Sequence, residues 1–378
     1  MNTSSTATSD TPISDTLSES RPDFHVTLRD RLLQLRHEKN LRQRDAAIVL
    51  QISEAEAVAA FVNADDSLPT QATLLRPHNG QGFTELLEQI PTLGHVMALT
   101  RNEAAVHEVD GCYENMSHQG PVGLALGQAI DLRIFYSRWR YGFAVTESNA
   151  KGRQHSLQFF DASGTALHKI YLREQSNLTA YQALVAQYRA PEQPAHIAIE
   201  PAPVSTIAPV TLDQALIESF RQQWRNMQDT HEFVTLLKNF NLHRTQALSL
   251  AGTELAYQVS NQSARDLLQQ VAQDDIPIMV FVGNPGMIQI HSGAIKTVRI
   301  MNNWLNILDP GFNLHLREDL IAQSWVVKKP TVDGVVTSLE LFDDAGNTLV
   351  MFFGVRQPGE AELTRWRSST ARLIPLAS

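Results

Sequence analysis

Apolar positions recur at helical spacing near the start of the chain. Leu28, Leu32 and Leu35 fall on one helical face within residues 25–63, which we therefore predict to be helical. Ser53 precedes an acidic first turn, as the N-cap of a further helix does.

A second helical region follows the middle of the chain. Leu216, Phe220, Trp224 and Met227 are spaced by four, four and three residues, which gives the apolar stripe of an amphipathic helix. The segment 211–214 before it has the pattern of a capping box. We expect further helices over residues 83–90, 178–188, 261–272 and 360–373.

Strand-like sequence follows each helical region. Residues 96–171 and 277–354 hold short apolar runs that are separated by glycine-containing turns. Helices followed by strands, twice over, predict an α+β fold rather than alternating βαβ units. Each of two similar halves would then contribute helices followed by a mainly antiparallel β-sheet.

Direct repetition supports this duplication. Residues 156–164 recur as residues 338–346 at an offset of 338 − 156 = 182, and residues 41–46 resemble 242–247 at an offset near 201. The difference predicts an insertion of 201 − 182 = 19 residues, which we place around Asn63–Gly80. The predicted division is a disordered tail at 1–23, an N-terminal repeat at 24–190, a proline-rich linker at 191–210 and a C-terminal repeat at 211–378.

Composition narrows the class of protein. The 378 residues carry a formal net charge of −9, which disfavours a non-specific nucleic-acid binder. The single cysteine, Cys112, excludes an intrachain disulfide and indicates the cytoplasm, and no apolar run is long enough for a membrane helix. Residues 42–57 have some character of a helix-turn-helix, so a DNA-binding regulator remains an alternative.

The two repeats differ in charge at three aligned positions. Cations of the second copy stand opposite neutral or acidic residues of the first, in the pairs Arg244/Gln43, Lys329/Glu147 and Arg356/Glu174. One interpretation is drift on solvated surfaces. The other is an anion site confined to the C-terminal half, where carboxylate or phosphate groups would bind.

Two further segments offer candidate ligand-binding side chains. His231 follows Met227 by about one turn, so we place it on the apolar side of the same helix, with Asp229 able to hold one ring nitrogen. Packing of a core or capping histidine is the alternative. Arg133 and Phe135 share one face of a predicted strand. The simpler interpretation of Arg133 is that it forms a cross-strand ion pair rather than binding a ligand.

Several stretches together resemble one known family. The chain from about residue 24 onward is similar to the bacterial cytoplasmic haem-utilisation proteins, the haemin-degrading or haemin-transport proteins of the HemS/HmuS type. The resemblance rests on Trp224–Phe233, Asn313–Glu318, Lys328–Gly334 with Thr337–Glu340, and His168–Tyr171.

The resemblance implies a haem site and a role for each candidate. His231 matches the axial ligand of the haem iron, and Arg133, with Phe135, matches the distal side, where Arg133 would be catalytic. Arg244, Lys329 and Arg356 match basic residues around the haem propionates. The chain departs from the family pattern at Met351 and at Phe353, a further expected haem contact, where some members carry Gln and Tyr. Because the first repeat lacks the cations, we expect one haem per chain.

The resemblance also implies the function. We expect a cytoplasmic haem-binding protein of bacterial haem uptake that takes part in haem degradation and iron release, with an external reductant such as NAD(P)H. A carrier that receives haem from an importer and delivers it to a separate haem oxygenase is the first alternative. A DNA-binding regulator and a ligand-free scaffold follow, and neither nucleic acid nor membrane insertion is expected.

Overall fold

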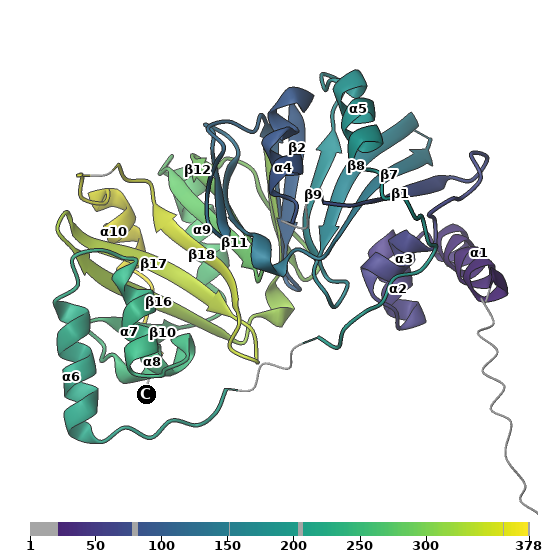
Figure 1. The fold of residues 1–378 in the computed structure, drawn as a ribbon. Coiled ribbons are helices and arrows are strands. Elements are labelled where there is room, and N and C mark those ends of the chain that lie inside the picture. The colour runs from purple at the N-terminus through teal and green to yellow at the C-terminus, as the bar shows by residue number, and fades with distance from the viewer. Residues whose placement is uncertain (1–21, 78–81, 151, 203–206, 358, 377–378) are drawn as a thin grey trace, which may run out of the picture.

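Two nine-stranded antiparallel sheets form the centre of the described molecule (Figure 1). The computed structural model describes residues 22–77, 82–150, 152–202, 207–357 and 359–376. Sheet A has the order β1 (Thr70–Leu75), β7 (Tyr141–Asn149), β8 (Gly152–Phe160), β9 (Ala166–Leu172), β2 (Val96–Arg101), β3 (Ala105–Gly111), β15 (Phe312–Arg317), β14 (Trp304–Asp309) and β13 (Val298–Met301). Sheet B has the order β10 (Ala256–Val259), β16 (Gln323–Thr331), β17 (Gly334–Phe342), β18 (Thr348–Gly354), β11 (Ile278–Asn284), β12 (Met287–Gly293), β6 (Asp131–Phe135), β5 (Val122–Leu126) and β4 (Ser117–Gln119).

The halves exchange strands, which the sequence did not predict. Strands β4, β5 and β6 come from the N-terminal half but complete sheet B, where β6 pairs with β12. Reciprocally, β13, β14 and β15 complete sheet A through the pairing of β15 with β3. Each sheet is therefore a joint product of both repeats, and a residue of the first repeat can take part in a site on sheet B.

A reciprocal pair of asparagines marks the approximate two-fold relation between the halves. The side chain of Asn102 donates to the carbonyls of Gly283 and Leu349, and Asn284 donates to the carbonyls of Arg101 and Leu167. Every one of these partners is related by the 182-residue offset (284 − 102, 283 − 101, 349 − 167). The predicted duplication and α+β class are confirmed.

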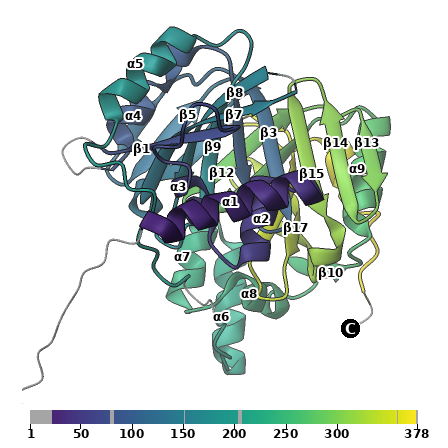
Figure 2. The ribbon, with the colours of Figure 1, turned by 90° about the vertical axis from the view of Figure 1, so that its right-hand side faces the viewer.

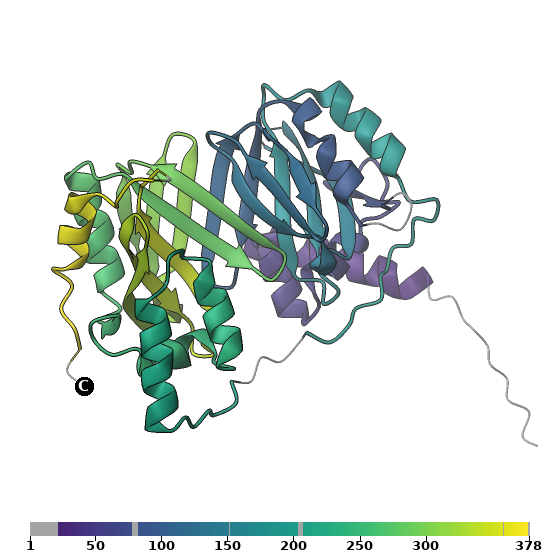
Figure 3. The ribbon, with the colours of Figure 1, turned by 60° about the vertical axis from the view of Figure 1, so that its left-hand side comes forward.

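Helices cover both faces of the sheets. Helices α1 (Pro22–Lys39), α2 (Gln43–Leu50) and α3 (Glu54–Ala59) pack on sheet A, and α6 (Gln214–Arg225), α7 (Glu232–Asn239) and α8 (Arg244–Leu250) pack on sheet B. The opposite faces carry α4 (Thr84–Glu88) with α5 (Leu178–Tyr188), and α9 (Ser263–Gln273) with α10 (Thr364–Thr370), as Figure 3 shows. The main core includes buried residues of both sheets and of these four helices.

Most predicted elements are present, with local corrections. Ser53 caps α3, as expected, and forms a full capping box with Glu56. The capping box predicted at 211–214 is wrong, because Asp213 caps α6 by accepting from the backbone N–H of Leu216. Strands β1 and β10 lie outside the predicted strand regions.

The size of the predicted insertion needs correction. Helix α8 corresponds to α3 rather than to α2, because Ser53 and His243 begin equivalent capping boxes at an offset of 243 − 53 = 190. The offset is 256 − 72 = 184 at residues paired with Val145 and Val327. The difference of 190 − 184 = 6 residues lies between α3 and β1, close to the predicted place, whereas the predicted offset of 201 and the insertion of 19 residues are wrong.

The linker follows the surface of the first half for part of its length. Gln193 bonds both backbone groups of Leu74, and the hydroxyl of Tyr141 donates to the carbonyl of Ala198. Most of the predicted tail, residues 1–21, lies outside the described residues, and α1 already begins at Pro22. Across the described part of the chain, no helix combines the length and apolar character needed to span a membrane.

Candidate functional site

A buried carboxylate binds two of the predicted cations. Glu340 on β17 is fully buried, and its oxygens accept from Nε and Nη2 of Arg244 at 2.6 and 2.8 Å and from Nζ of Lys329 at 2.8 Å. Arg244 is the first residue of α8, and Lys329 lies on β16 beside β17. The two cations that the repeat comparison selected therefore meet at one point under the helices.

Opposing electrostatic effects act on this cluster. Burial alone would raise the pKa of Glu340, but the adjacent Arg244 and Lys329 hold it well below its usual range. Burial lowers the pKa of Lys329 to about 8, with Glu340 opposing and Arg244 adding to the shift. The cluster has one negative and two positive groups, so it presents a net positive charge.

Aromatic rings surround the two cations. Phe233 of α7 lies 5.1 Å from the guanidinium of Arg244 and 5.0 Å from Nζ of Lys329, measured to its ring centroid. Phe353 of β18 lies 5.8 Å from the same Nζ and 5.0 Å from the ring of Phe281 on β11. The predicted residues Arg244, Lys329 and Phe353 are thus in one neighbourhood, which is apolar and cationic at once.

His231 lies in the turn between α6 and α7, so its predicted place on the helix of Met227 is wrong. Helix α6 ends at Arg225, and His231 is the N-cap of α7. Its side chain is 94% exposed, and Nδ1 lies 2.6 Å from a carboxylate oxygen of Asp229. The expected Asp229 contact is therefore present. Among the described residues, none hydrogen-bonds to Nε2, which can accept a ligand bond.

The turn is adjacent to the cation cluster and to Arg356. The carbonyl of Gln228 accepts from the backbone N–H of Val332, next to β16, and Phe233 follows His231 by two residues. Arg356 is 3.9 Å from Asp333, and its charge helps the hydrogen bonds from His231 to lower the pKa of Asp229. His231 and Arg356 therefore lie at or near the α6–α7 turn, and Arg244 and Lys329 contact Phe233 at the start of α7.

Arg133 and Phe135 reach the same sheet by strand exchange. Both lie on β6, where Arg133 is in register with Ile288 of β12. Because residues in register on adjacent strands share a face, Arg133 lies on the face of Phe281, Phe353 and Glu340. This part of the face is half-buried, and Arg133 forms an ion pair with Asp131 of its own strand rather than across strands.

The equivalent region of the N-terminal half has a different set of groups. Gln158 occupies the position of Glu340, and the buried carboxylate comes instead from Glu54, the first residue of α3. Because α3 corresponds to α8, Glu54 is the counterpart of Arg244, and the predicted pairing of Arg244 with Gln43 is wrong. Glu54 pairs with Arg101 and with Lys169, the latter at 2.5 Å. Burial would raise its pKa, but these cations lower it to about 2. The helix thus supplies the acid in the first half, whereas the sheet supplies it in the second.

The helices of the two halves correspond in order, α2 to α7 and α3 to α8 (Figure 2). The backbone N–H of Ile52 bonds to the carbonyl of Ala47 after α2, and that of Leu242 bonds to Leu237 after α7, at an offset of 242 − 52 = 190. At this offset Leu41 corresponds to His231, and Gln43 corresponds to Phe233. The first half therefore offers no imidazole at this position.

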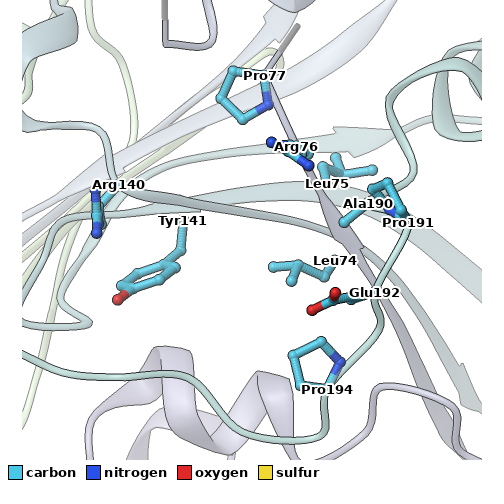
Figure 4. Close-up of a pocket in the computed structure, with 10 residues that line it drawn as sticks. All are labelled: Leu74, Leu75, Arg76, Pro77, Arg140, Tyr141, Ala190, Pro191, Glu192 and Pro194. Atoms are coloured by element: carbon cyan, nitrogen blue, oxygen red, sulfur yellow. The ribbon is translucent and has the colours of Figure 1, made fainter. Parts of the chain in front are cut away.

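A cavity of about 370 Å³ lies elsewhere, between β1, β7 and the start of the linker (Figure 4). Arg76, Arg140 and Glu192 border it, together with apolar groups and the ring of Tyr141. It contains none of the predicted site residues, and the Tyr141 hydroxyl already donates to Ala198. Mixed charge and an engaged hydroxyl make it a weaker candidate than the face of sheet B.

Sequence reasoning missed Glu340, Phe233 and Phe281. Glu340 stands opposite Gln158 in the same repeat comparison that selected the cations, so the signal was present. The chemistry of the combined set suits a flat apolar ligand with acidic groups: aromatic and methionine side chains on an open sheet face, a cationic end, and an accessible imidazole.

Comparisons with known proteins agree with this geometry. Residues 51–188 and 241–373 each match the family model described as the haemin-degrading HemS.ChuX domain. The hemin transport protein HmuS of Yersinia pestis is 44% identical over 333 residues, which are 88% of this chain and 92% of that protein.

Solved structures cover nearly the whole chain. Holo-PhuS, described as a heme-binding protein from Pseudomonas aeruginosa, superposes with a TM-score of 0.85 at 41% identity, covering 93% of this chain and 99% of that one. ChuS, described as an E. coli heme oxygenase, superposes with a TM-score of 0.80 at 38% identity, covering 92% and 100%. This chain belongs to the haemin-degrading HemS/ChuX family and carries one copy of the family domain in each half.

Proposed function

We propose that this protein binds one haem in bacterial haem utilisation, in the cytoplasm, between the α6–α7 turn and the open face of sheet B. The observation that carries the proposal is the joint position of Arg244, Lys329 and Phe353 around Phe233, two residues from the exposed imidazole of His231. HmuS and PhuS, named for hemin transport and heme binding, support the ligand class.

The residues present fit a haem. Nε2 of His231 would supply the axial iron bond, and Asp229 holds Nδ1 so that the ring keeps one tautomer and orientation. Lys329, Arg244 and Arg356 would bind the propionates, and the rings of Phe353 and Phe281 would contact the porphyrin. Arg133 and Phe135 would line the opposite side, where a guanidinium can donate hydrogen bonds without binding iron.

Absorption titration with haemin tests this proposal. The wild type should give a Soret band distinct from free haemin and an endpoint of one haem per chain. His231→Ala should shift the band and weaken binding, because the axial bond is lost while the cationic end remains. A wild-type spectrum identical to that of free haemin would refute the proposal, and an endpoint of two per chain would refute the single site.

We propose, second, that the bound haem is degraded when a reductant such as NAD(P)H and dioxygen are supplied. The likeness to ChuS, described as a heme oxygenase, favours this over a carrier role. With catalase present to remove free peroxide, the Soret band should decay and an open tetrapyrrole should form, more slowly in Arg133→Ala. A Soret band that persists until a separate oxygenase is added would instead identify a carrier, which would receive haem from an importer.

A further inference from the structure

Glu340 has an unusual place for an acid in a site that should receive acids. Its carboxylate is fully buried beneath the candidate propionate end, and it accepts three hydrogen bonds from Arg244 and Lys329. Ser338 adds a fourth at 2.9 Å. A carboxylate that only repelled the propionates would weaken haem binding. The presence of Glu340 between two cations therefore needs another explanation.

The charge state of Lys329 and the orientation of Arg244 explain why a buried acid lies at this position. Lys329 is buried with a guanidinium as neighbour, and both conditions favour its neutral form. The carboxylate of Glu340 is the charged group that opposes them. The same carboxylate accepts from Nε and Nη2 of Arg244, a two-pronged contact that fixes the guanidinium plane.

The first half shows what happens without this carboxylate on the sheet. Its position is taken by Gln158, whose Oε1 has no hydrogen-bond partner among the described residues. There the positions of Lys329 and Arg244 hold Glu147 and Glu54. The acid and both cations thus occur together in the second half and are all absent from the equivalent positions of the first.

We propose that Glu340 is a positioning residue for the haem site, which holds Lys329 charged and Arg244 oriented so that both can bind the propionates. The inference rests on the proposed function and adds to it the group that prepares the cations. Glu340 itself touches no ligand, because it is covered by the two side chains that it positions.

The alternative role for Glu340 is competition with the propionates for the two cations. If Glu340 merely competed with the propionates, its removal would free both cations and tighten haem binding. The buried position of Lys329 argues against this, because an ammonium without its counter-ion loses its proton rather than waiting for a ligand. We therefore expect removal of the acid to weaken binding, most strongly at alkaline pH.

The test is haemin affinity of Glu340→Gln between pH 6 and 9, with wild type in parallel. The variant carries the residue of Gln158 and should bind haemin at least tenfold more weakly at pH 8. The pH above which affinity declines should move to lower values than in the wild type. The affinity for haemin dimethyl ester, which has no free carboxylates, should be unchanged.

Glu54→Gln is the matched control. It also removes a buried carboxylate from an Arg–Lys pair, so it reproduces the loss of stability, yet it should leave haemin affinity and its pH profile unchanged. Ser338→Ala removes one hydrogen bond to Glu340. It should shift the pH above which haemin affinity declines in the same direction, by a smaller amount, and it replaces Glu340→Gln as the test variant if that protein does not fold.

The outcomes separate this inference from the proposed function. The inference is overturned if folded Glu340→Gln has wild-type haemin affinity and pH profile, or binds haemin more tightly. The proposed haem-binding function still stands in that case if the wild type binds haemin. Equal weakening for haemin and its dimethyl ester means a structural role only, which also overturns it. A wild type that binds neither porphyrin overturns both.

Discussion

At the scale of single residues, the candidate site combines groups of two kinds. Lys329 and Glu340 are buried and depend on each other, so a change in either disturbs stability as well as binding. Arg356 is only a quarter exposed but pairs loosely with Asp333 at 3.9 Å, and its contribution can be tested without disturbing a buried pair.

Arg356→Gln should weaken haemin binding about tenfold, because one charge-assisted hydrogen bond to a propionate contributes about 1.5–3 kcal/mol. The free energy of unfolding should change by less than about 1 kcal/mol, as for most partly exposed ion pairs. Absorption titration and urea unfolding measure the two quantities.

Arg173→Gln is the control, since Arg173 forms a similarly exposed but closer ion pair with Asp110 in the first half, at 2.6 Å, and adjoins Glu174, the counterpart of Arg356. It should leave haemin binding unchanged. Equal loss in both variants would assign the effect of Arg356 to general charge rather than to the site.

At the scale of elements, the turn between α6 and α7 distinguishes the halves. The turn exposes His231, and Asp229 stabilises it twice, by accepting from the backbone N–H of His231 at 2.7 Å and by contacting its ring. The first half has Leu41 at the equivalent position, between α1 and α2. The residue in this helix connection, rather than a change in the sheets, thus provides the candidate iron ligand.

Asp229→Ala should weaken haemin binding about 10- to 100-fold, the range usual for the carboxylate partner of a ligating histidine. Because Asp229 and His231 are both exposed, stability should change little. Titration with haemin beside circular dichroism would detect this. An unaltered affinity would show that the imidazole needs no second partner or does not bind iron.

At the scale of the whole molecule, strand exchange makes the two halves interdependent. Asn102 and Asn284 each donate two hydrogen bonds to backbone carbonyls of the other half. The approximate two-fold symmetry makes their contributions equivalent, although their sequence neighbourhoods differ.

Asn102→Ala and Asn284→Ala should therefore lower the free energy of unfolding by similar amounts, about 2–4 kcal/mol each, since each leaves two carbonyls without their donor. Urea unfolding of the two variants would measure both. A loss in only one variant would contradict the symmetric role.

Acid should destabilise the fold through buried histidines near the centre. Burial lowers the pKa of His107 and His168 to about 3 and of His291 to about 4. Their pKa values in the unfolded chain are near 6.5, so the unfolded state binds more protons between about pH 4 and 6.5. The stability that their neutral forms contribute is present above that window and is lost as pH falls through it, by about 1.4 kcal/mol per pH unit for each histidine.

His107→Gln, which copies Gln289 of the other half, should reduce that slope by one histidine's share. Urea unfolding at pH 5, 6 and 7 gives the slope for both proteins. Identical slopes would show that His107 does not titrate on unfolding.

The sequence predicted much of this arrangement, for identifiable reasons. Periodicity predicts the helices and the repeated strands, and the offset of 182 led to Lys329 and Arg356. Arg244 was selected at an offset of 201, which the structure corrects to 190, and its counterpart remains uncharged or acidic in either case. Periodicity could not predict the exchange of β4–β6 with β13–β15, because both pairings bury the same alternating residues. The place of His231 was wrong because periodicity continues through Met227 while the helix ends at Arg225, where no proline or glycine interrupts the pattern.

The most direct test of the account is the structure of the protein bound to haemin. We predict one haem per chain, with iron bonded to Nε2 of His231, propionates at Lys329, Arg244 and Arg356, and Arg133 across the porphyrin. Haem bound instead in the cavity beside Tyr141, or on the face of sheet A under α1, with His231 still free in solvent, would contradict it.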